Sequence, residues 1–142
     1  MTGLDCNILV QLALQDHPAN ATTVAVVQTE VQSGSRLVFP ALVIHEFLHV
    51  ITDTRRFSPP LTMTEALDWV ESFLANSSLG VLEPTPESLR QTLHWMREFN
   101  LGRKRILDTH LAAILYVAGV RRLCTSNPAD FAVFNVFEII TP

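Results

Sequence analysis

The stretch that decides the fold is LVFPALVIHEFLHVITD, residues 37–53. Its first part, Leu37-Val38-Phe39, is a short apolar run closed by Pro40, which is typical of a strand buried on both faces. The part that follows, residues 41–53, is long and apolar enough for a buried helix. This stretch therefore predicts a strand that leads directly into a helix.

The same alternation continues in both directions along the chain. Further helices are predicted over residues 7–14, 20–32, 64–75 (with Thr64 as its cap), 85–99 and 108–118, and further strands over residues 1–5, 81–82, 123–126 and 136–140. Strands that alternate with helices require crossover connections. We therefore expect one α/β domain over residues 1–142, with a mainly parallel central sheet of four or five strands flanked by helices.

The charge of the chain limits how it could bind nucleic acid. Charged residues make up 17% of the sequence, below the roughly 25% of an average domain, which favours a surface partly covered by a partner. The net charge of −4 argues against binding nucleic acid by bulk charge alone. Most basic residues nevertheless fall in three runs that could contact a phosphate backbone: Arg55-Arg56, Arg103-Lys104-Arg105 and Arg121-Arg122.

Nothing in the sequence predicts export or membrane insertion. No apolar run reaches the roughly 18 residues of a membrane helix, and the opening MTGLDCN has neither the basic nor the apolar part of a signal peptide. We expect a cytoplasmic protein without a membrane partner, in which Cys6 and Cys124 are reduced and form no metal-ligand pattern.

Four acidic residues lie in apolar surroundings. Asp5 follows the first strand, Glu46 lies one turn into the helix after the second, Asp108 begins a helix, and Asp130 follows the fourth strand. Asp5 and Asp108 could each cap a helix, and Asp130 could hold the turn before the last strand. Glu46 is harder to explain structurally, because it is mid-helix with apolar neighbours.

The positions of these acids predict a shared site. In a parallel sheet the carboxyl ends of the strands meet at one edge, so all four carboxylates could converge there. Converging carboxylates raise one another's pKa unless a cation neutralises them. Oxygen ligands select Mg²⁺ or Mn²⁺, and such ions bridge phosphates and activate water, so phosphodiester hydrolysis is the chemistry that this pattern favours.

At these residues the chain resembles the PIN domain family, and within it the VapC-type toxins of toxin–antitoxin pairs. LDCNILV at residues 4–10 is similar to the family's "LDTNVLV", and ALVIHEFLHVI at residues 41–51 resembles its glutamate helix. LDTHLAA at residues 107–113 looks like "DALIAA", and TSNPADF at residues 125–131 is similar to "TxNxxDF". The four motifs occur in the family's order and span nearly the whole chain.

The resemblance implies a single PIN-like three-layer domain with a particular activity. It implies a Mg²⁺- or Mn²⁺-dependent endoribonuclease, usually a homodimer, that a cognate antitoxin holds inactive. Asp5, Glu46, Asp108 and Asp130 would be both the catalytic acids and the metal ligands. Asn127 stands where many relatives carry another acid, which leaves open whether Asn127 or Asp130 faces the metal, and Thr125 or Asn127 would support a ligand or a water.

Two other interpretations and one further hypothesis come from the residues themselves. His45-Glu46-Phe47-Leu48-His49 matches the H-E-x-x-H pattern of zinc proteases, although the extended form of that motif is absent. A non-catalytic α/β binding module would use the acids only as caps. The run Arg103-Lys104-Arg105, directly before Asp108, is expected to contact the RNA backbone.

Overall fold

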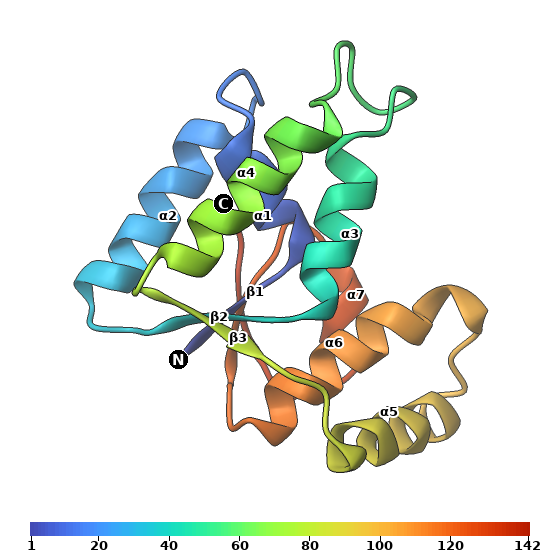
Figure 1. Cartoon of the computed structure of the whole chain (residues 1–142). Coiled ribbons are helices and arrows are strands. Elements are labelled where there is room, and N and C mark those ends of the chain that lie inside the picture. The colour runs from blue at the N-terminus through green and yellow to red at the C-terminus, as the bar shows by residue number, and fades with distance from the viewer.

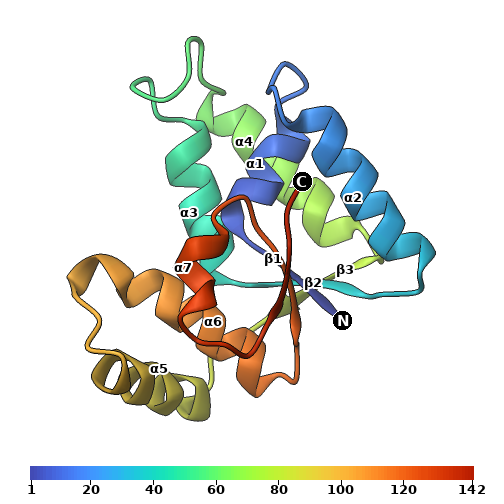
Figure 2. The same ribbon diagram turned by 180° about the vertical axis from the view of Figure 1, so that it is seen from behind.

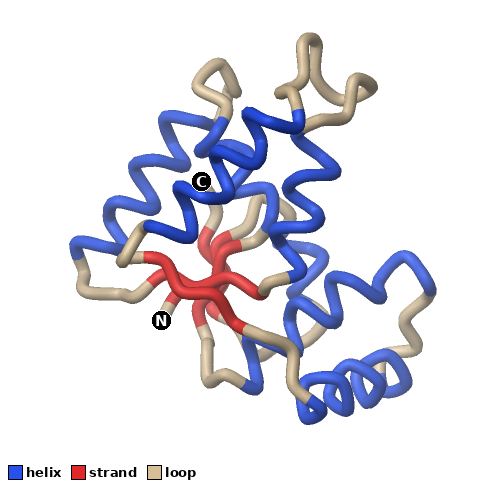
Figure 3. The backbone as a smooth tube through the Cα atoms, in the orientation of Figure 1, coloured by secondary structure: helices blue, strands red, loops and turns tan.

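A five-stranded, entirely parallel sheet forms the centre of the computed structural model, which describes residues 1–142 (Figures 1 and 3). The strand order is β3-β2-β1-β4-β5, with helices on both sides. The predicted α/β fold with a mainly parallel sheet is confirmed. The elements are β1 Thr2–Leu4, α1 Cys6–Ala13, α2 Asn20–Gln32, β2 Leu37–Pro40, α3 Leu42–Ile51, α4 Met63–Ala75, β3 Leu79–Leu82, α5 Pro86–Glu98, the 3₁₀ turn η1 Arg103–Arg105, α6 Ile106–Val117, β4 Arg122–Cys124, α7 Pro128–Ala132 and β5 Glu138–Ile140.

The helices form two groups around the sheet. Helices α1, α2, α3 and α4 pack against one another, and α5 pairs with α6 away from them (Figures 1 and 2). The buried core includes Phe39 of β2 and Phe47 of α3. None of the helices combines the length and the apolarity that crossing a membrane requires.

The first strand, β1, lies at the centre of the sheet. It pairs with β2 on one side and β4 on the other, and all three of its residues are buried. A Cβ atom on Gly3 would lie 2.8 Å from Leu115 Cδ1 of α6, so the glycine permits this helix to approach the strand. Because β1 is central, Asp5 directly after it stands in the middle of the sheet's carboxyl edge.

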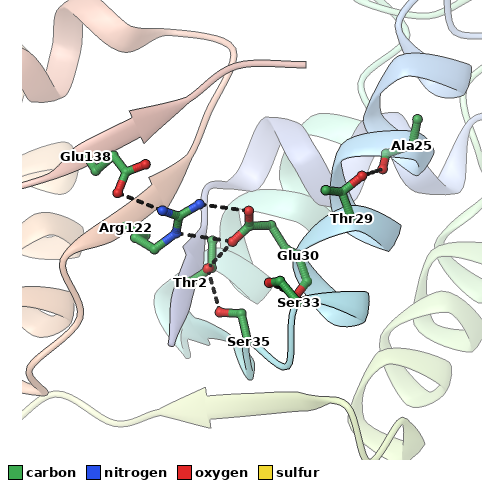
Figure 4. A network of polar contacts seen from close by, with 8 residues as sticks. All are labelled: Thr2, Ala25, Thr29, Glu30, Ser33, Ser35, Arg122 and Glu138. Atoms are coloured by element: carbon green, nitrogen blue, oxygen red, sulfur yellow. Dashed lines mark hydrogen bonds and ion pairs between the residues drawn. The ribbon is translucent and has the colours of Figure 1, made fainter.

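A partly exposed network of ion pairs and hydrogen bonds closes the opposite, amino end of the sheet (Figure 4). Arg122 of β4 contacts Glu30 of α2 at 2.9 Å and Glu138 of β5 at 2.6 Å. Glu30 also accepts a 2.6 Å hydrogen bond from the Thr2 hydroxyl of β1, which in turn lies 2.8 Å from Ser35 Oγ. This network ties the first, fourth and fifth strands to the end of α2.

Two boundaries differ from the sequence prediction for identifiable reasons. The helix expected to begin with Thr64 as its cap is instead capped by Thr62, which exchanges hydrogen bonds with Glu65 in a capping box. The segment after β4, expected to be a turn, contains the short helix α7, with Pro128 in its first turn and Asp130 near its positive end. Asp130 therefore projects from a helix rather than from a turn.

Candidate active site

A cavity of about 220 Å³ lies at the carboxyl edge of the sheet, and all four acids line it. Asp5 reaches it from the end of β1, Glu46 from α3, Asp108 from the first turn of α6, and Asp130 from α7. The cavity thus brings together side chains from four segments that are far apart in the sequence. The polar or aromatic residues that also line it are Asn7, Gln11, His17, Arg56, Phe57 and Asn127.

Asp5 is the most enclosed of the four carboxylates, with 7% of its surface exposed. It accepts hydrogen bonds from the Cys6 N–H at 2.7 Å, the Asn7 amide at 2.7 Å and the Thr125 hydroxyl at 2.6 Å. Burial raises the pKa of Asp5, although these hydrogen bonds oppose the shift. Asp5 therefore caps α1 and also presents a carboxylate that no cation contacts directly.

Thr125 fixes the position of the Asp5 carboxylate by hydrogen bonding. Its hydroxyl donates to Asp5 and accepts from the Asn127 N–H at 3.0 Å and the Asn7 amide at 3.3 Å. The Asn7 side-chain oxygen Oδ1 accepts a hydrogen bond from the Ser126 N–H at 3.1 Å. These bonds join the start of α1 to the loop after β4, so the two segments hold Asp5 in one position. Thr125 itself is completely buried.

Glu46 makes no hydrogen bond or ion pair with another side chain, yet it is half-buried. Desolvation, followed by the negative charges of Asp5 and Asp108, raises the pKa of Glu46 to about 7, while Arg56 opposes the shift. His45 and His49, which share its helix, are exposed and do not line the cavity. The two histidines of the H-E-x-x-H pattern therefore do not join Glu46 at a common site.

Arg105 lies between the remaining two acids. Its Nε is 3.7 Å from Asp108 Oδ2, its Nη1 is 3.4 Å from Asp130 Oδ1, and its Nη2 donates to the backbone oxygen of Asp130. Burial and the charge of Asp130 raise the pKa of Asp108, whereas Arg105 lowers it. Arg103 and Lys104, by contrast, are exposed on the 3₁₀ turn. The three members of the basic run therefore have different surroundings.

Comparison with known proteins identifies the family. The profile of the PIN domain matches residues 4–134. The chain belongs to the PIN domain family. This PIN domain is 29% identical over 139 residues to "Ribonuclease VapC31" of Mycobacterium tuberculosis, an alignment that covers 98% of this chain and 96% of that relative.

Solved structures share the fold of this PIN domain over nearly its whole length. A chain of VapBC2 from Rickettsia felis, bound to a DNA fragment from its promoter, matches with a TM-score of 0.71 and 14% identity, over 99% of this chain and 97% of that one. A chain of VapC20 from Mycobacterium tuberculosis, described as a Sarcin-Ricin loop cleaving toxin, matches with a TM-score of 0.64 and 11% identity over 87% of each chain.

The donor set of this PIN domain fits a hard divalent cation that keeps much of its water. No group of three or more His, Cys, Asp and Glu side chains is already arranged to hold one ion. Mg²⁺ is commonly held by only one or two carboxylates together with waters and substrate phosphates, so a closed ligand set is not required. Cys6 also lines the cavity, but burial raises the pKa of its thiol, which leaves carboxylate oxygens as the charged donors.

The PIN domain has site residues that the sequence did not single out. Asn7 could have been found from its place two residues after Asp5 in the first turn of a helix. His17 and Phe57 lie in the loops after α1 and α3, where no periodicity indicates which side chain turns toward the acids. Arg56, from the basic run Arg55-Arg56, lines the cavity beside them. Asn127 and Asp130 both line the cavity, so the structure keeps both as candidate donors.

Proposed function

We propose that this PIN domain is a Mg²⁺- or Mn²⁺-dependent endoribonuclease that hydrolyses RNA phosphodiester bonds. The observation that carries the proposal is the cavity in which Asp5, Glu46, Asp108 and Asp130 meet. The pKa values of Asp5, Glu46 and Asp108 are raised, because these carboxylates are partly removed from water without enough positive charge beside them. A bound cation would supply that positive charge. The similarity to a protein named as a ribonuclease supports RNA as the substrate.

Each acid has a distinct part in the proposed reaction. A bound divalent ion would supply positive charge for the scissile phosphate and an activated water. Asp5 and Asp108 would be its main ligands, with Asp5 oriented by Asn7 and Thr125. Glu46, whose pKa is about 7, can accept a proton from the attacking water at its carboxylate near neutral pH. Asp130 or Asn127 would complete the donor set.

The basic run before α6 would contribute to RNA binding. Arg103 and Lys104 are exposed and free to contact the RNA backbone. Arg105 is paired with Asp108 and Asp130 here, so its contact with RNA would require that those carboxylates be neutralised by another cation. Replacing Arg103 and Lys104 by glutamine should reduce the salt dependence of RNA binding. An unchanged salt slope would remove these residues from the interface.

The decisive experiment measures RNA cleavage by purified protein. Wild-type protein should cut RNA in Mg²⁺ or Mn²⁺ and stop when the ion is chelated, and both Asp5→Asn and Asp108→Asn should abolish cutting. Asp68→Asn, on the exposed face of α4, is the matched control and should cut normally. Cleavage that survives both cavity substitutions would refute the assignment.

We also propose that the protein is the cytoplasmic toxin of a toxin–antitoxin pair and forms a homodimer. The similarity to chains from VapBC complexes supports a protein partner. Apolar side chains exposed on α5 and at the start of α6 offer surface that such partners could cover: Leu89, Leu93, Ile106 and Leu107. Expression of the wild-type protein without an antitoxin should arrest growth, and Asp108→Asn should relieve the arrest. Unimpaired growth with the wild-type protein would oppose the toxin role.

A further inference from the structure

A second, larger cavity adjoins the acid cavity. It measures about 620 Å³ and is formed by the loop after α1, the loop after α3, and Trp69 of α4. His17 and Phe57 line both cavities and so form the wall between them. The acid cavity, at about 220 Å³, is smaller than the roughly 300–1,000 Å³ of most small-molecule pockets, whereas the second cavity lies within that range. A substrate phosphate at the acids could therefore place an adjoining group in the second cavity.

The walls of the second cavity are aromatic and apolar, with polar groups among them. Phe57 and Trp69 are only partly buried. The Trp69 ring packs against the Phe73 ring, and the two ring centroids are 5.7 Å apart. Gln15, Ser58 and the carboxylate of Asp16 supply hydrogen-bonding groups to the same cavity. This mixture suits a flat ring with an apolar face and a polar edge better than it suits a plain hydrocarbon.

His17 presents a hydrogen-bond donor at the wall between the cavities. Its Nδ1 accepts a 3.1 Å hydrogen bond from the Ala19 N–H, so in the neutral ring the proton is on Nε2. Nε2 has no partner within the chain, although the residue lines both cavities. It is therefore available to donate to an oxygen of a ligand that spans them.

Positive charge is placed beside the same wall. Arg56 lines the acid cavity, directly before Phe57 in the chain. Arg55 and Arg56 share a single carboxylate, Asp53, at 3.1 Å and 3.8 Å. The loop thus keeps an excess positive charge next to an aromatic side chain, which complements a nucleotide with its phosphate beside its base.

We propose that the second cavity binds an unstacked nucleobase of single-stranded RNA, next to the phosphate that the acids engage. The base would stack on Phe57 or Trp69, and the His17 Nε2–H and Arg56 would meet its phosphate. This inference rests on the proposed ribonuclease function and adds to it a specific place on the protein for one base of the substrate. Paired RNA would have to open before it could fill the cavity.

The test combines protein variants with abasic RNA. Binding of a fluorescent single-stranded RNA is measured in the Asp108→Asn background, in which the proposed cleavage does not proceed. Phe57→Leu and Trp69→Leu keep apolar volume but remove an aromatic face, and each should weaken binding about fivefold or more. Leu67→Ala, exposed on the same helix as Trp69 and outside the cavity, is the matched control and should bind as the parent does.

The abasic RNA separates a stacking role from a folding role. One abasic position should weaken binding to the parent about fivefold or more, and this penalty should largely disappear in the Phe57→Leu or Trp69→Leu protein. A misfolded variant would instead lose binding to every RNA, and its melting curve would reveal it.

Three outcomes would overturn the proposal, and they are distinguishable. If wild-type protein cuts RNA but the leucine variants bind normal and abasic RNA as the parent does, the nucleobase site is wrong and the nuclease assignment stands. If wild-type protein neither binds nor cuts RNA, both fail. Variants that keep RNA binding but lose binding to a protein partner would assign the cavity to that partner.

Discussion

Each end of the sheet buries one carboxylate, and the surroundings shift the pKa of the two carboxylates in opposite directions. Glu30 at the amino end and Asp5 at the carboxyl end are both 7% exposed. Arg122 holds the pKa of Glu30 below its usual value, whereas burial raises the pKa of Asp5 above its own. The difference lies in the partners, because Glu30 has a guanidinium in contact and Asp5 has only neutral hydrogen-bond donors. The carboxylate at the amino end of the sheet is thus paired with a cation, and the carboxylate at the carboxyl end is not.

The largest expected contrast is between activity and stability. Asp5→Asn should lower RNA cleavage by about 100-fold or more, because it removes a proposed ligand of the activating ion. It should change the free energy of unfolding of metal-free protein little, because removing a buried charge without a cation offsets the loss of part of the hydrogen bonding that Asp5 accepts. Cleavage rates and urea melts measure the two quantities. A variant that unfolds readily would mean that Asp5 is mainly structural.

The amino end should show the reverse behaviour. Arg122→Ala leaves Glu30 buried without its cation and should lower the free energy of unfolding. The loss should be smaller than for a fully buried pair, because the Arg122 side chain is 39% exposed. Cleavage per folded molecule should stay normal. Arg90→Ala, exposed on α5, is the control, and an equal effect of both substitutions would show that the ion pair contributes nothing specific.

The pH dependence of stability should separate the two ends next. When a chelator has removed divalent ions, Glu46 stays protonated in the native protein up to about pH 7, whereas in the unfolded chain it loses its proton near pH 4.5. The contribution of Glu46 to the free energy of unfolding is therefore complete below pH 4.5 and is lost as the pH rises to about 7. Glu30 acts oppositely, because its lowered pKa stabilises the protein above pH 4.5 and that contribution is lost as the pH falls further.

Glu46→Gln tests this difference. At pH 8 without divalent ions it should be more stable than wild-type protein by about 1–2 kcal/mol, a figure reduced for solvent screening of a half-buried group. At pH 4 the two proteins should be equally stable. Urea melts across this range provide the measurement, and parallel stability curves for the two proteins would contradict the raised pKa.

The smallest expected effect is stabilisation by the ion itself. At three times its dissociation constant, Mg²⁺ should stabilise the native state by about 0.8 kcal/mol and raise the melting temperature by about 2–3 °C at pH 7.5. Asp108→Asn should lose most of this increase, whereas Arg122→Ala should keep it. An equal increase in all three proteins would indicate a general salt effect rather than binding at the acids.

The sequence predicted the fold where long patterns constrain it. The run from Leu37 to Asp53 combines a short apolar stretch closed by Pro40 with a longer apolar segment, and helix α2 begins and ends where its spacing indicated. The cap of α4 was misplaced because two threonines stand two residues apart. Glu65, three residues after Thr62, was the signal that could have decided between them.

Within the site, the sequence predicted positions but not pairings. The acids were found because parallel strands carry their ends to one edge, a rule that needs only the order of elements. The contact between Arg105 and Asp130 depends on where α7 packs, 25 residues further along the chain. The second cavity joins two loops to α4, and loop conformations have no period that a sequence displays.

The central place of β1 has a consequence for synthesis on the ribosome. The residues of β1 are translated long before those of β4, and both edges of β1 are paired only once β4 is present. Asp5 also gains its shortest hydrogen bond only from Thr125, 120 residues later. A nascent or prematurely terminated chain would therefore lack a correctly held Asp5. The proposed nuclease site is therefore assembled only after Thr125 has been translated.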